Sequence, residues 1–223
     1  MTTPRSSLQR RANVFAALGD PRRLEIAEEL SRSDRTPGEL IEKFELSSAL
    51  LAHHLDVLEH AGLIERTNSH ADGRKRFVRL LPQHRTMLAA HEVPREVTFV
   101  CTHNSARSQL AAALWRHLTG RKASSAGTRP ADRVHPSAIE VAEHHGLDLR
   151  TTRPRRLGRI KPSTTIITVC DQAHDELPAS LRRLHWSVAD PAEVGTMRAF
   201  NDTFTTLHER ITMFSTPTHP RKA

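Results

Sequence analysis

The feature that most constrains the fold and chemistry of this sequence is a cysteine followed, six positions later, by an arginine and a serine. An apolar run, 96–100, leads into Cys101, and Arg107 and Ser108 open a segment of helical period. This order predicts a strand, a tight loop and a helix. The N–H groups of such a loop and the positive end of the helix can hold a tetrahedral anion, which indicates thiolate attack on an oxyanion.

Each position of the loop has a chemical role in this hypothesis. A thiol is mostly protonated near pH 7, so we expect the loop N–H groups and the helix dipole to stabilise the Cys101 thiolate. Arg107 can bind two oxyanion oxygens, and Ser108 can donate a hydrogen bond to the thiolate. Asn104 tolerates a left-handed conformation and can maintain the loop shape. The oxyanion-binding loop is predicted to comprise Thr102, His103, Asn104, Ser105 and Ala106.

Two later segments can complete such a site. Asp190 precedes Pro191, and its carboxyl can act as a general acid over the thiolate or as the N-cap of the next helix. Both roles can hold together. Cys170 ends a β-branched run, and the ends of parallel strands face a common site. For Cys170, a redox role and a role as a small core residue are both open.

The distribution of charge points to anionic ligands of the second half. The 223-residue chain has a net charge of +8. Residues 1–94 carry 14 Lys/Arg against 13 Asp/Glu, whereas residues 95–223 carry 19 against 12. That excess suits an anionic substrate or cofactor, although a solvated basic surface is the alternative. Residues 150–161 hold six cations, and a solvated loop, a site for an anionic thiol and a site for a phosphate backbone are all open: Arg150, Arg153, Arg155, Arg156, Arg159 and Lys161.

Composition excludes several classes of protein. Two cysteines far apart do not form a disulfide-stapled secreted scaffold. No apolar stretch follows the first five residues and no run approaches membrane-spanning length, so we expect no signal peptide, no membrane segment and a cytoplasmic location. The histidines of the first half lack a ligand spacing and that half has no cysteine, so we predict no metal site.

Periodicity and turn residues predict two domains joined by a linker at residues 84–94. Residues 8–83 are expected to form a mainly α winged helix-turn-helix with a β-hairpin wing. Asp20 and Thr36 are its predicted N-caps, and a later helix is expected from Ser48 to His60. The hairpin strands are expected at 63–67 and 76–80, and a short helix near 85–90.

Residues 95–217 alternate strands with helices, which predicts an α/β domain with a parallel sheet and helices on both faces. Strands are expected at 96–101, 123–126, 164–170 and 184–188. Helices are expected at 106–118, 136–145 and 193–214.

The first domain resembles ArsR-type winged-helix repressors. The similarity rests on Ala17–Ile26, Leu46–Leu58 and Ala61–Ile64. It implies a recognition helix in the major groove, a wing on the DNA backbone or in the minor groove, and a homodimer. Relatives that sense soft metals carry cysteines near the position of Thr36, and this half has none. The DNA contacts implied by the resemblance are Ser47, Ser48 and His53 on the helix, and Arg74, Lys75 and Arg76 on the wing.

The second domain resembles the low-molecular-weight protein-tyrosine-phosphatase fold and, within it, the thiol-linked arsenate reductases. The matching segments are Cys101–Gln109, Ser125–Gly127, Val169–Ala173, His185-Trp186 and Asp190-Pro191. Gln109 after Ser108, and the His-Trp pair before Asp-Pro, favour the reductases, because phosphatases usually have Ser-Pro after the arginine. His103 stands where a glycine is usual.

The resemblance implies a mechanism. Cys101 attacks arsenate, and Cys170 then attacks Cys101, which releases arsenite and leaves a disulfide. A third cysteine that carries this disulfide to thioredoxin is replaced by Leu177. The resemblance therefore implies no bound cofactor and an external reductant. Either a low-molecular-weight thiol with its redoxin resolves the adduct, or the Cys101–Cys170 disulfide is reduced directly, for example by thioredoxin.

Two other functions remain open from the sequence. A tyrosine phosphatase would form a Cys101–phosphate intermediate, use Asp190 as acid and turn over phosphate esters without a thiol. A transcription regulator whose second domain only senses an oxyanion or redox state would show arsenate- or oxidation-dependent DNA affinity and negligible turnover.

Overall fold

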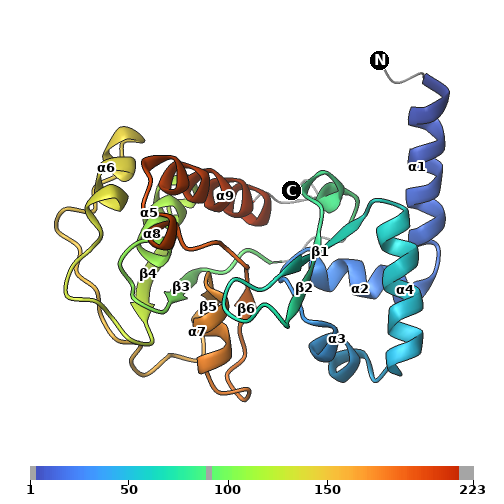
Figure 1. Ribbon diagram of the computed structural model, residues 1–223, viewed down its shortest axis with the longest axis horizontal. Coiled ribbons are helices and arrows are strands. Elements are labelled where there is room, and N and C mark those ends of the chain that lie inside the picture. The colour runs from blue at the N-terminus through green and yellow to red at the C-terminus, as the bar shows by residue number, and fades with distance from the viewer. Residues whose placement is uncertain (1–3, 89–91, 216–223) are drawn as a thin grey trace, which may run out of the picture. The chain divides into compact units, whose positions relative to one another are not determined.

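The computed structural model describes residues 4–88 and 92–215, which divide into two compact units (Figure 1). Of the described residues, the first unit comprises 4–69 and 73–88, and the second comprises 70–72 and 92–215. The first unit contains, in chain order, α1 (Pro4–Leu18), α2 (Pro21–Leu30), α3 (Pro37–Phe44), α4 (Ser48–His60), β1 (Ile64–Asn68), β2 (Arg76–Leu80) and the 3₁₀ helix η1 (Pro82–Met87). The second contains β3 (Glu96–Cys101), α5 (Arg107–Thr119), β4 (Lys122–Gly127), α6 (Pro136–His144), β5 (Thr165–Thr168), α7 (Asp171–Glu176), β6 (Leu184–His185), α8 (Pro191–Val194) and α9 (Met197–Ser215). Within the described ranges, no helix is both long and apolar enough to cross a membrane.

Side-chain caps set where the helices of the first unit begin. Asp20 accepts a hydrogen bond from the Arg23 N–H at 2.9 Å, as predicted for the N-cap of α2. Thr36 and Glu39 form a reciprocal capping box at the start of α3. Ser47 caps α4 by accepting from the N–H three residues later. Ser47 therefore fixes the start of α4, which the ArsR resemblance implies is the recognition helix.

The hairpin completes a winged helix-turn-helix, as predicted. β1 and β2 pair antiparallel, with Arg66 opposite Val78. Gly62, at φ 70°, ends the turn that follows α4. The short helix expected near residues 85–90 is η1, which begins earlier, while residues 89–91 lie outside the described part. The core that joins α2–α4 to the hairpin includes Ile26, Leu30, Leu40, Leu51, Leu55, Leu58 and Val78.

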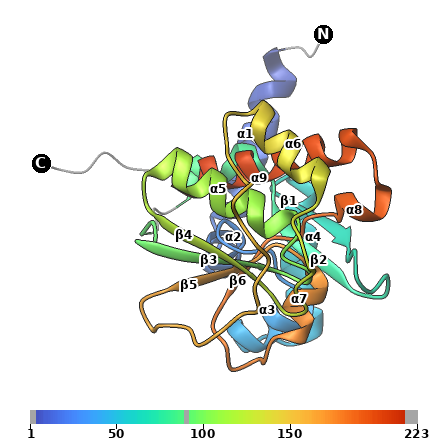
Figure 2. The same ribbon diagram turned by 90° about the vertical axis from the view of Figure 1, so that its left-hand side faces the viewer.

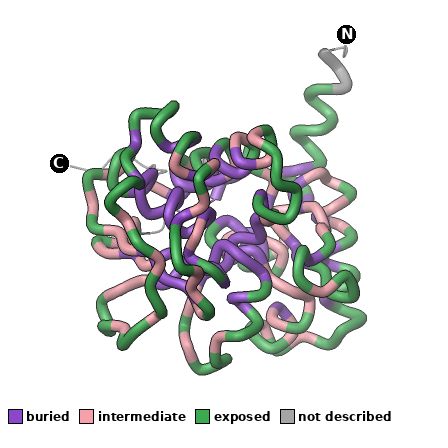
Figure 3. Tube along the Cα trace, turned by 60° about the vertical axis from the view of Figure 1, so that its left-hand side comes forward, coloured by how far each residue is buried: buried purple, intermediate pink, exposed green. Residues whose placement is uncertain are grey.

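The second unit is built on a parallel sheet in the order β4-β3-β5-β6. Figure 2 shows α5 and α9 above this sheet and α7 below it, which agrees with the predicted fold. Phe99 of β3 packs against Trp115 and Trp186, with ring centroids 5.9 and 5.8 Å apart. Figure 3 marks such buried positions in purple. Because β3 and β4 end together, Cys101 lies opposite Gly127 at the carboxyl edge of the sheet.

Three elements differ from the sequence prediction. The helix α7 was missed, because six residues are too few to show a helical period. The strand expected at 184–188 pairs only at Leu184 and His185, at the sheet edge. The helix expected at 193–214 is divided into α8 and α9, because Gly195 adopts a left-handed conformation at φ 71°.

Gly127→Ala tests the contact between β4 and the cysteine loop. A Cβ at Gly127 would lie 2.6 Å from the Thr102 carbonyl oxygen and 3.2 Å from the Asn104 nitrogen. Both are backbone atoms, so the loop must shift. We expect the free energy of unfolding to fall by about 1–3 kcal/mol in denaturant titrations, and iodoacetamide alkylation of Cys101 to change in rate.

Gly158→Ala is the matched control, because a Cβ there meets no atom within 4 Å. We expect it to match the wild type in stability and in Cys101 reactivity. A Gly127→Ala protein with wild-type stability and reactivity would contradict the close contact.

Candidate active site

Cys101 lies at the end of β3 and its sulfur is buried in a small hydrogen-bond network. The Asn104 N–H donates to Cys101 Sγ at 3.1 Å, and Ser108 Oγ lies 3.0 Å from the same sulfur. Asn104 Nδ2 donates to Ser108 Oγ at 2.8 Å. That bond uses one lone pair of the oxygen and leaves the hydroxyl hydrogen of Ser108 free to donate to Sγ, as the thiolate hypothesis requires.

Asn104 holds the loop in shape. It is fully buried and left-handed, at φ 50°. Gln109 Nε2 donates to its carbonyl oxygen at 3.1 Å, and the Arg155 N–H donates to its Oδ1 at 2.9 Å. His103 is exposed and does not have a positive φ. The position where a glycine is usual therefore accepts a side chain without backbone strain.

Arg107, the first residue of α5, is 5% exposed and is held by the loop that precedes α8. Nη1 donates to the Val188 carbonyl at 3.0 Å, and Nη2 forms an ion pair with Asp190 Oδ2. The other carboxylate oxygen, Oδ1, accepts from the Ala192 N–H at 3.1 Å and caps α8. Asp190 thus caps α8 with one carboxylate oxygen and pairs with Arg107 through the other. Two of the five guanidinium N–H donors are used in these bonds, which leaves others for an oxyanion.

Cys170 lies beside the oxyanion loop, directly before α7. Its Sγ is 3.1 Å from the hydroxyl oxygen of Thr102, the residue after Cys101. Cys101 and Cys170 are both free thiols, 2% and 3% exposed. The structure therefore brings the two cysteines of the sequence to one site.

Burial and charge oppose each other at Cys101. Burial raises the pKa of the Cys101 thiol above its ordinary value, and the nearby Cys170 acts in the same direction. The positive Arg107 and the Ser108 hydrogen bond act to lower it. The sequence predicted the stabilising effects of Arg107 and Ser108 on the thiolate but not the desolvation, which outweighs them.

The remaining loop residues are fixed by the segment after β4. The carbonyl oxygens of Thr102 and Ser105 accept hydrogen bonds, each at 2.9 Å, from N–H groups of Arg129 and His135. Ala106 is the residue before α5 and is buried. All five predicted loop residues therefore lie around Cys101, between β3 and α5.

The predicted DNA-contacting residues fall in two exposed groups of the first unit. Ser47, Ser48 and His53 lie at the start and on the exposed side of α4. Arg74 and Lys75 lie in the turn between β1 and β2, and Arg76 is the first residue of β2. All six side chains are exposed, which a DNA-contacting role requires.

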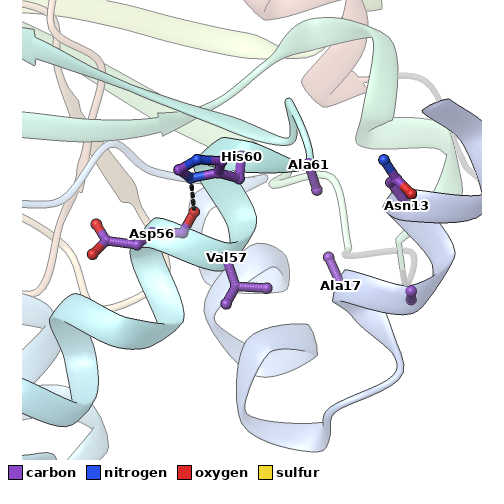
Figure 4. A pocket seen from close by; sticks show the side chains of 7 residues that line it. Asn13, Ala17, Asp56, Val57, His60 and Ala61 are labelled. Carbon is purple, nitrogen blue, oxygen red and sulfur yellow. Dashed lines mark hydrogen bonds between the residues drawn. The ribbon is translucent and has the colours of Figure 1, made fainter.

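A separate pocket of about 490 Å³ lies between α1 and α4 (Figure 4). In it, His60 Nδ1 donates to the Asp56 carbonyl oxygen at 3.2 Å. It contains none of the predicted catalytic or DNA-contacting residues. Across the described residues, no group of three or more His, Cys, Asp or Glu side chains is placed to hold a metal ion. The pocket lining is Asn13, Ala16, Ala17, Asp56, Val57, His60 and Ala61.

Comparison with known families decides what the second unit is. The family model for low molecular weight phosphotyrosine protein phosphatases matches residues 96–219, more than half of the chain. The chain belongs to this phosphatase family. The model for bacterial regulatory proteins of the arsR family matches residues 20–66. An arsR-family helix-turn-helix is therefore fused to a low-molecular-weight phosphatase domain, which confirms both resemblances.

Named relatives of the phosphatase domain include arsenate reductases. That of Staphylococcus xylosus is 31% identical over 105 residues, which cover 44% of this chain and 79% of the relative. Arsenate reductase 1 of Bacillus cereus is 32% identical over 108 residues, 45% of this chain and 80% of the relative. A crystal structure of an arsenate reductase from Archaeoglobus fulgidus has 29% identity and a TM-score of 0.46, covering 52% of this chain and 94% of that one.

The phosphatase domain also holds a buried polar network that the sequence did not reveal. His185 Nε2 lies 3.1 Å from Asp171 Oδ1, and Ser187 donates to Asp171 Oδ2 at 3.1 Å. Thr168 Oγ1 lies 2.9 Å from His185 Nδ1. Burial acts to raise the pKa of Asp171, but the hydrogen bonds and charge of His185, with Ser187, lower it from 3.8 to about 2. The network fixes the residue that follows Cys170. The sequence offers one signal of this network, which is that an acidic residue, Asp171, directly follows Cys170.

The reactivity of Cys101 should rise with pH through a midpoint above 9.0, the ordinary thiol value, because burial raises its pKa. Arg107→Gln should move the midpoint further up, since the cation that favours the thiolate is lost. The rate of iodoacetamide labelling of the Cys101 peptide, followed by mass spectrometry against pH, measures both. Arg198→Gln, an exposed change on α9, is the control. A midpoint below 9, or one that Arg107→Gln leaves unmoved, would contradict this account.

Asp171→Asn should destabilise the protein in a pH-dependent way. The folded-state pKa of Asp171 lies below its ordinary value of 3.8, at about 2. Its stabilisation is therefore present above pH 3.8 and is lost as the pH falls toward 2. We expect a loss of about 2 kcal/mol at pH 7 in denaturant unfolding, and convergence with the wild type near pH 2. If the difference in unfolding free energy between the wild type and Asp171→Asn does not change at low pH, Asp171 does not have a lowered pKa.

Proposed function

We propose that this chain is a thiol-dependent arsenate reductase fused to a DNA-binding transcription regulator. One observation carries the catalytic half of the proposal: the Thr102 hydroxyl holds the sulfur of Cys170 beside the oxyanion loop, at 3.1 Å. A phosphatase needs one nucleophilic thiol, whereas reduction of arsenate consumes two. The named arsenate reductases, which align over about four-fifths of their own length, support the same activity.

The first step uses the loop and α5. The loop N–H groups and the free donors of Arg107 bind arsenate. Cys101 Sγ attacks arsenic as the thiolate, which Arg107 and Ser108 stabilise against burial. Water leaves as the proton released from the Cys101 thiol is returned to an arsenate oxygen, and Asp190 beside Arg107 is placed to relay that proton when its carboxyl is protonated. The product is a covalent Cys101 thiol–arsenate adduct.

The second step uses Cys170. Its thiolate attacks Cys101 Sγ, the sulfur–arsenic bond breaks, and arsenic leaves with the bonding electron pair as arsenite. The two steps sum to protein(SH)₂ + H₃AsO₄ → protein(S–S) + H₃AsO₃ + H₂O. Arsenic is reduced from +5 to +3 and two thiols are oxidised to one disulfide. An external thiol must then return two electrons, which suits the reducing cytoplasm that we propose as the location.

Arsenite release from arsenate, with a low-molecular-weight thiol and its redoxin supplied, tests the reductase. Cys101→Ser should abolish turnover, because no adduct forms. Cys170→Ser should form the adduct but stop before disulfide formation. The matched assay follows hydrolysis of p-nitrophenyl phosphate without thiol.

Each alternative function has its own result. Ester turnover that survives Cys170→Ser but fails in Asp190→Asn would make the domain a phosphatase. No turnover of either substrate, together with arsenate-dependent DNA affinity, would make it a sensor.

We propose that the arsR-family unit binds an operator as a homodimer, through α4 and the wing. Replacing Arg74, Lys75 and Arg76 by Gln should weaken binding to every DNA sequence, because wing cations neutralise phosphates. Because a homodimer loses six wing cations, the slope of log K against log salt should become shallower by roughly five. Fluorescence anisotropy with DNA selected from a random pool measures this.

His53→Ala should instead alter sequence preference, since its exposed side chain lies on the recognition helix. A Lys122→Gln/Arg198→Gln variant of the other unit should change neither property. An unchanged salt slope in the wing variant would refute the wing contacts.

A further inference from the structure

The segment 150–161 carries six exposed cations in twelve residues. Arg150 pairs with Asp148 and Glu143. Four other cations of this segment form no ion pair with any described residue: Arg153, Arg156, Arg159 and Lys161. Like charges this close repel one another, so folding alone gives no reason to gather them.

The segment is built into the domain rather than loosely attached. Leu157 and Ile160 pack against the core of the second unit. The Gly127 N–H donates to the Arg155 carbonyl at 2.8 Å, and the Leu157 N–H donates to the Gly127 carbonyl at 2.9 Å. With its apolar side chains turned inward, the segment presents its cations outward as a fixed basic face.

This basic face adjoins the reacting sulfur. The Arg155 N–H donates to Asn104 Oδ1 at 2.9 Å, and the Asn104 N–H donates to Cys101 Sγ at 3.1 Å. Two hydrogen bonds and one residue therefore connect the basic segment to the nucleophile. Residues 155–157 therefore lie beside the oxyanion loop, at the carboxyl end of β4.

The site lacks a surface thiol that could pass electrons to a protein. The sequence has two cysteines, and both are buried, at 2% and 3% exposure. A redoxin must bring its own sulfur against a protein sulfur to exchange a disulfide. A small thiol can enter where a protein surface cannot.

We infer that the basic face of residues 153–161 docks an anionic low-molecular-weight thiol, a carboxylate-bearing thiol peptide, as the reductant of the site. The carboxylates pair with Arg156 and Arg159 while the sulfur reaches the Cys101–Cys170 disulfide. This inference rests on the proposed reductase function.

The electron balance involves two molecules of the thiol. The first thiolate attacks one disulfide sulfur and forms a mixed disulfide, and the second displaces the protein thiol: protein(S–S) + 2 RSH → protein(SH)₂ + RSSR. Two thiols are oxidised to one disulfide, and the protein disulfide is reduced to two thiols. No other co-reactant is needed.

Binding is tested first, without chemistry. S-methylglutathione, an unreactive thioether with two carboxylates, is titrated into Cys101→Ser protein at low salt by calorimetry. Adding R156Q and R159Q should weaken binding about fivefold to tenfold, as expected for two exposed ion pairs. Adding K122Q and R198Q should leave binding unchanged. Lys122 begins β4 at the opposite end of the strand from Gly127, and Arg198 lies on α9, so the pair controls for net charge.

Reduction is tested second. The Cys101–Cys170 disulfide is made with diamide and reduced by 3-mercaptopropionate or by 2-mercaptoethanol, an anionic and a neutral thiol. The ratio of the two rate constants should fall in R156Q/R159Q and not in K122Q/R198Q, and high salt should reduce it in the parent.

The outcomes separate the two proposals. Absent binding, or equal weakening by both double variants, would overturn the docking inference whatever the turnover. Binding as expected without arsenate turnover would overturn the reductase and leave the anion site. Thioredoxin-driven reduction at full rate in R156Q/R159Q, with no charge preference among small thiols, would make a protein redoxin the partner and refute the inference.

Discussion

The arrangement of the active site depends on the hydrogen bonds of one buried amide, Asn104. Its backbone N–H is aimed at Cys101 Sγ, its side-chain amide orients Ser108, and its carbonyl groups accept from Gln109 and Arg155. A left-handed backbone makes these contacts possible together, and asparagine tolerates that conformation better than most side chains. Asn104 therefore fixes the relative positions of Cys101 Sγ, the Ser108 hydroxyl and the backbone of Arg155.

Burial of the site has two opposite effects, because it disfavours the free thiolate and strengthens the charge interactions with a bound oxyanion. Desolvation disfavours the Cys101 thiolate, and Arg107 and Ser108 only partly offset it. Arg107 is meanwhile held by Asp190 and the Val188 carbonyl, so an incoming oxyanion meets a guanidinium that is already positioned. Excluding water strengthens every charge interaction of the site once the oxyanion is bound. Both sulfurs are buried with it, at 2% and 3% exposure.

Much of the fold could be predicted from the sequence, because its signals are local. The strand ending at Cys101, the loop and the start of α5 follow from one short segment, and Asp20 and Thr36 cap the helices they were expected to cap. Other features depend on distant partners. The contact between Thr102 and Cys170 joins positions 68 residues apart, and the Asp171–His185 pair forms only when β6 lies beside β5. Periodicity cannot report such pairs, and it cannot detect the six-residue helix between them.

The most direct test of the central claim is a single turnover without any external thiol. Reduced protein is mixed with excess arsenate, arsenite is quantified, and the protein is digested without reduction for mass spectrometry. The account predicts one arsenite per chain, a mass loss of two hydrogens, and a peptide pair joined through Cys101 and Cys170. Arsenite formation with both thiols still free, or a disulfide without arsenite, would contradict the proposal that these two buried sulfurs supply the electrons.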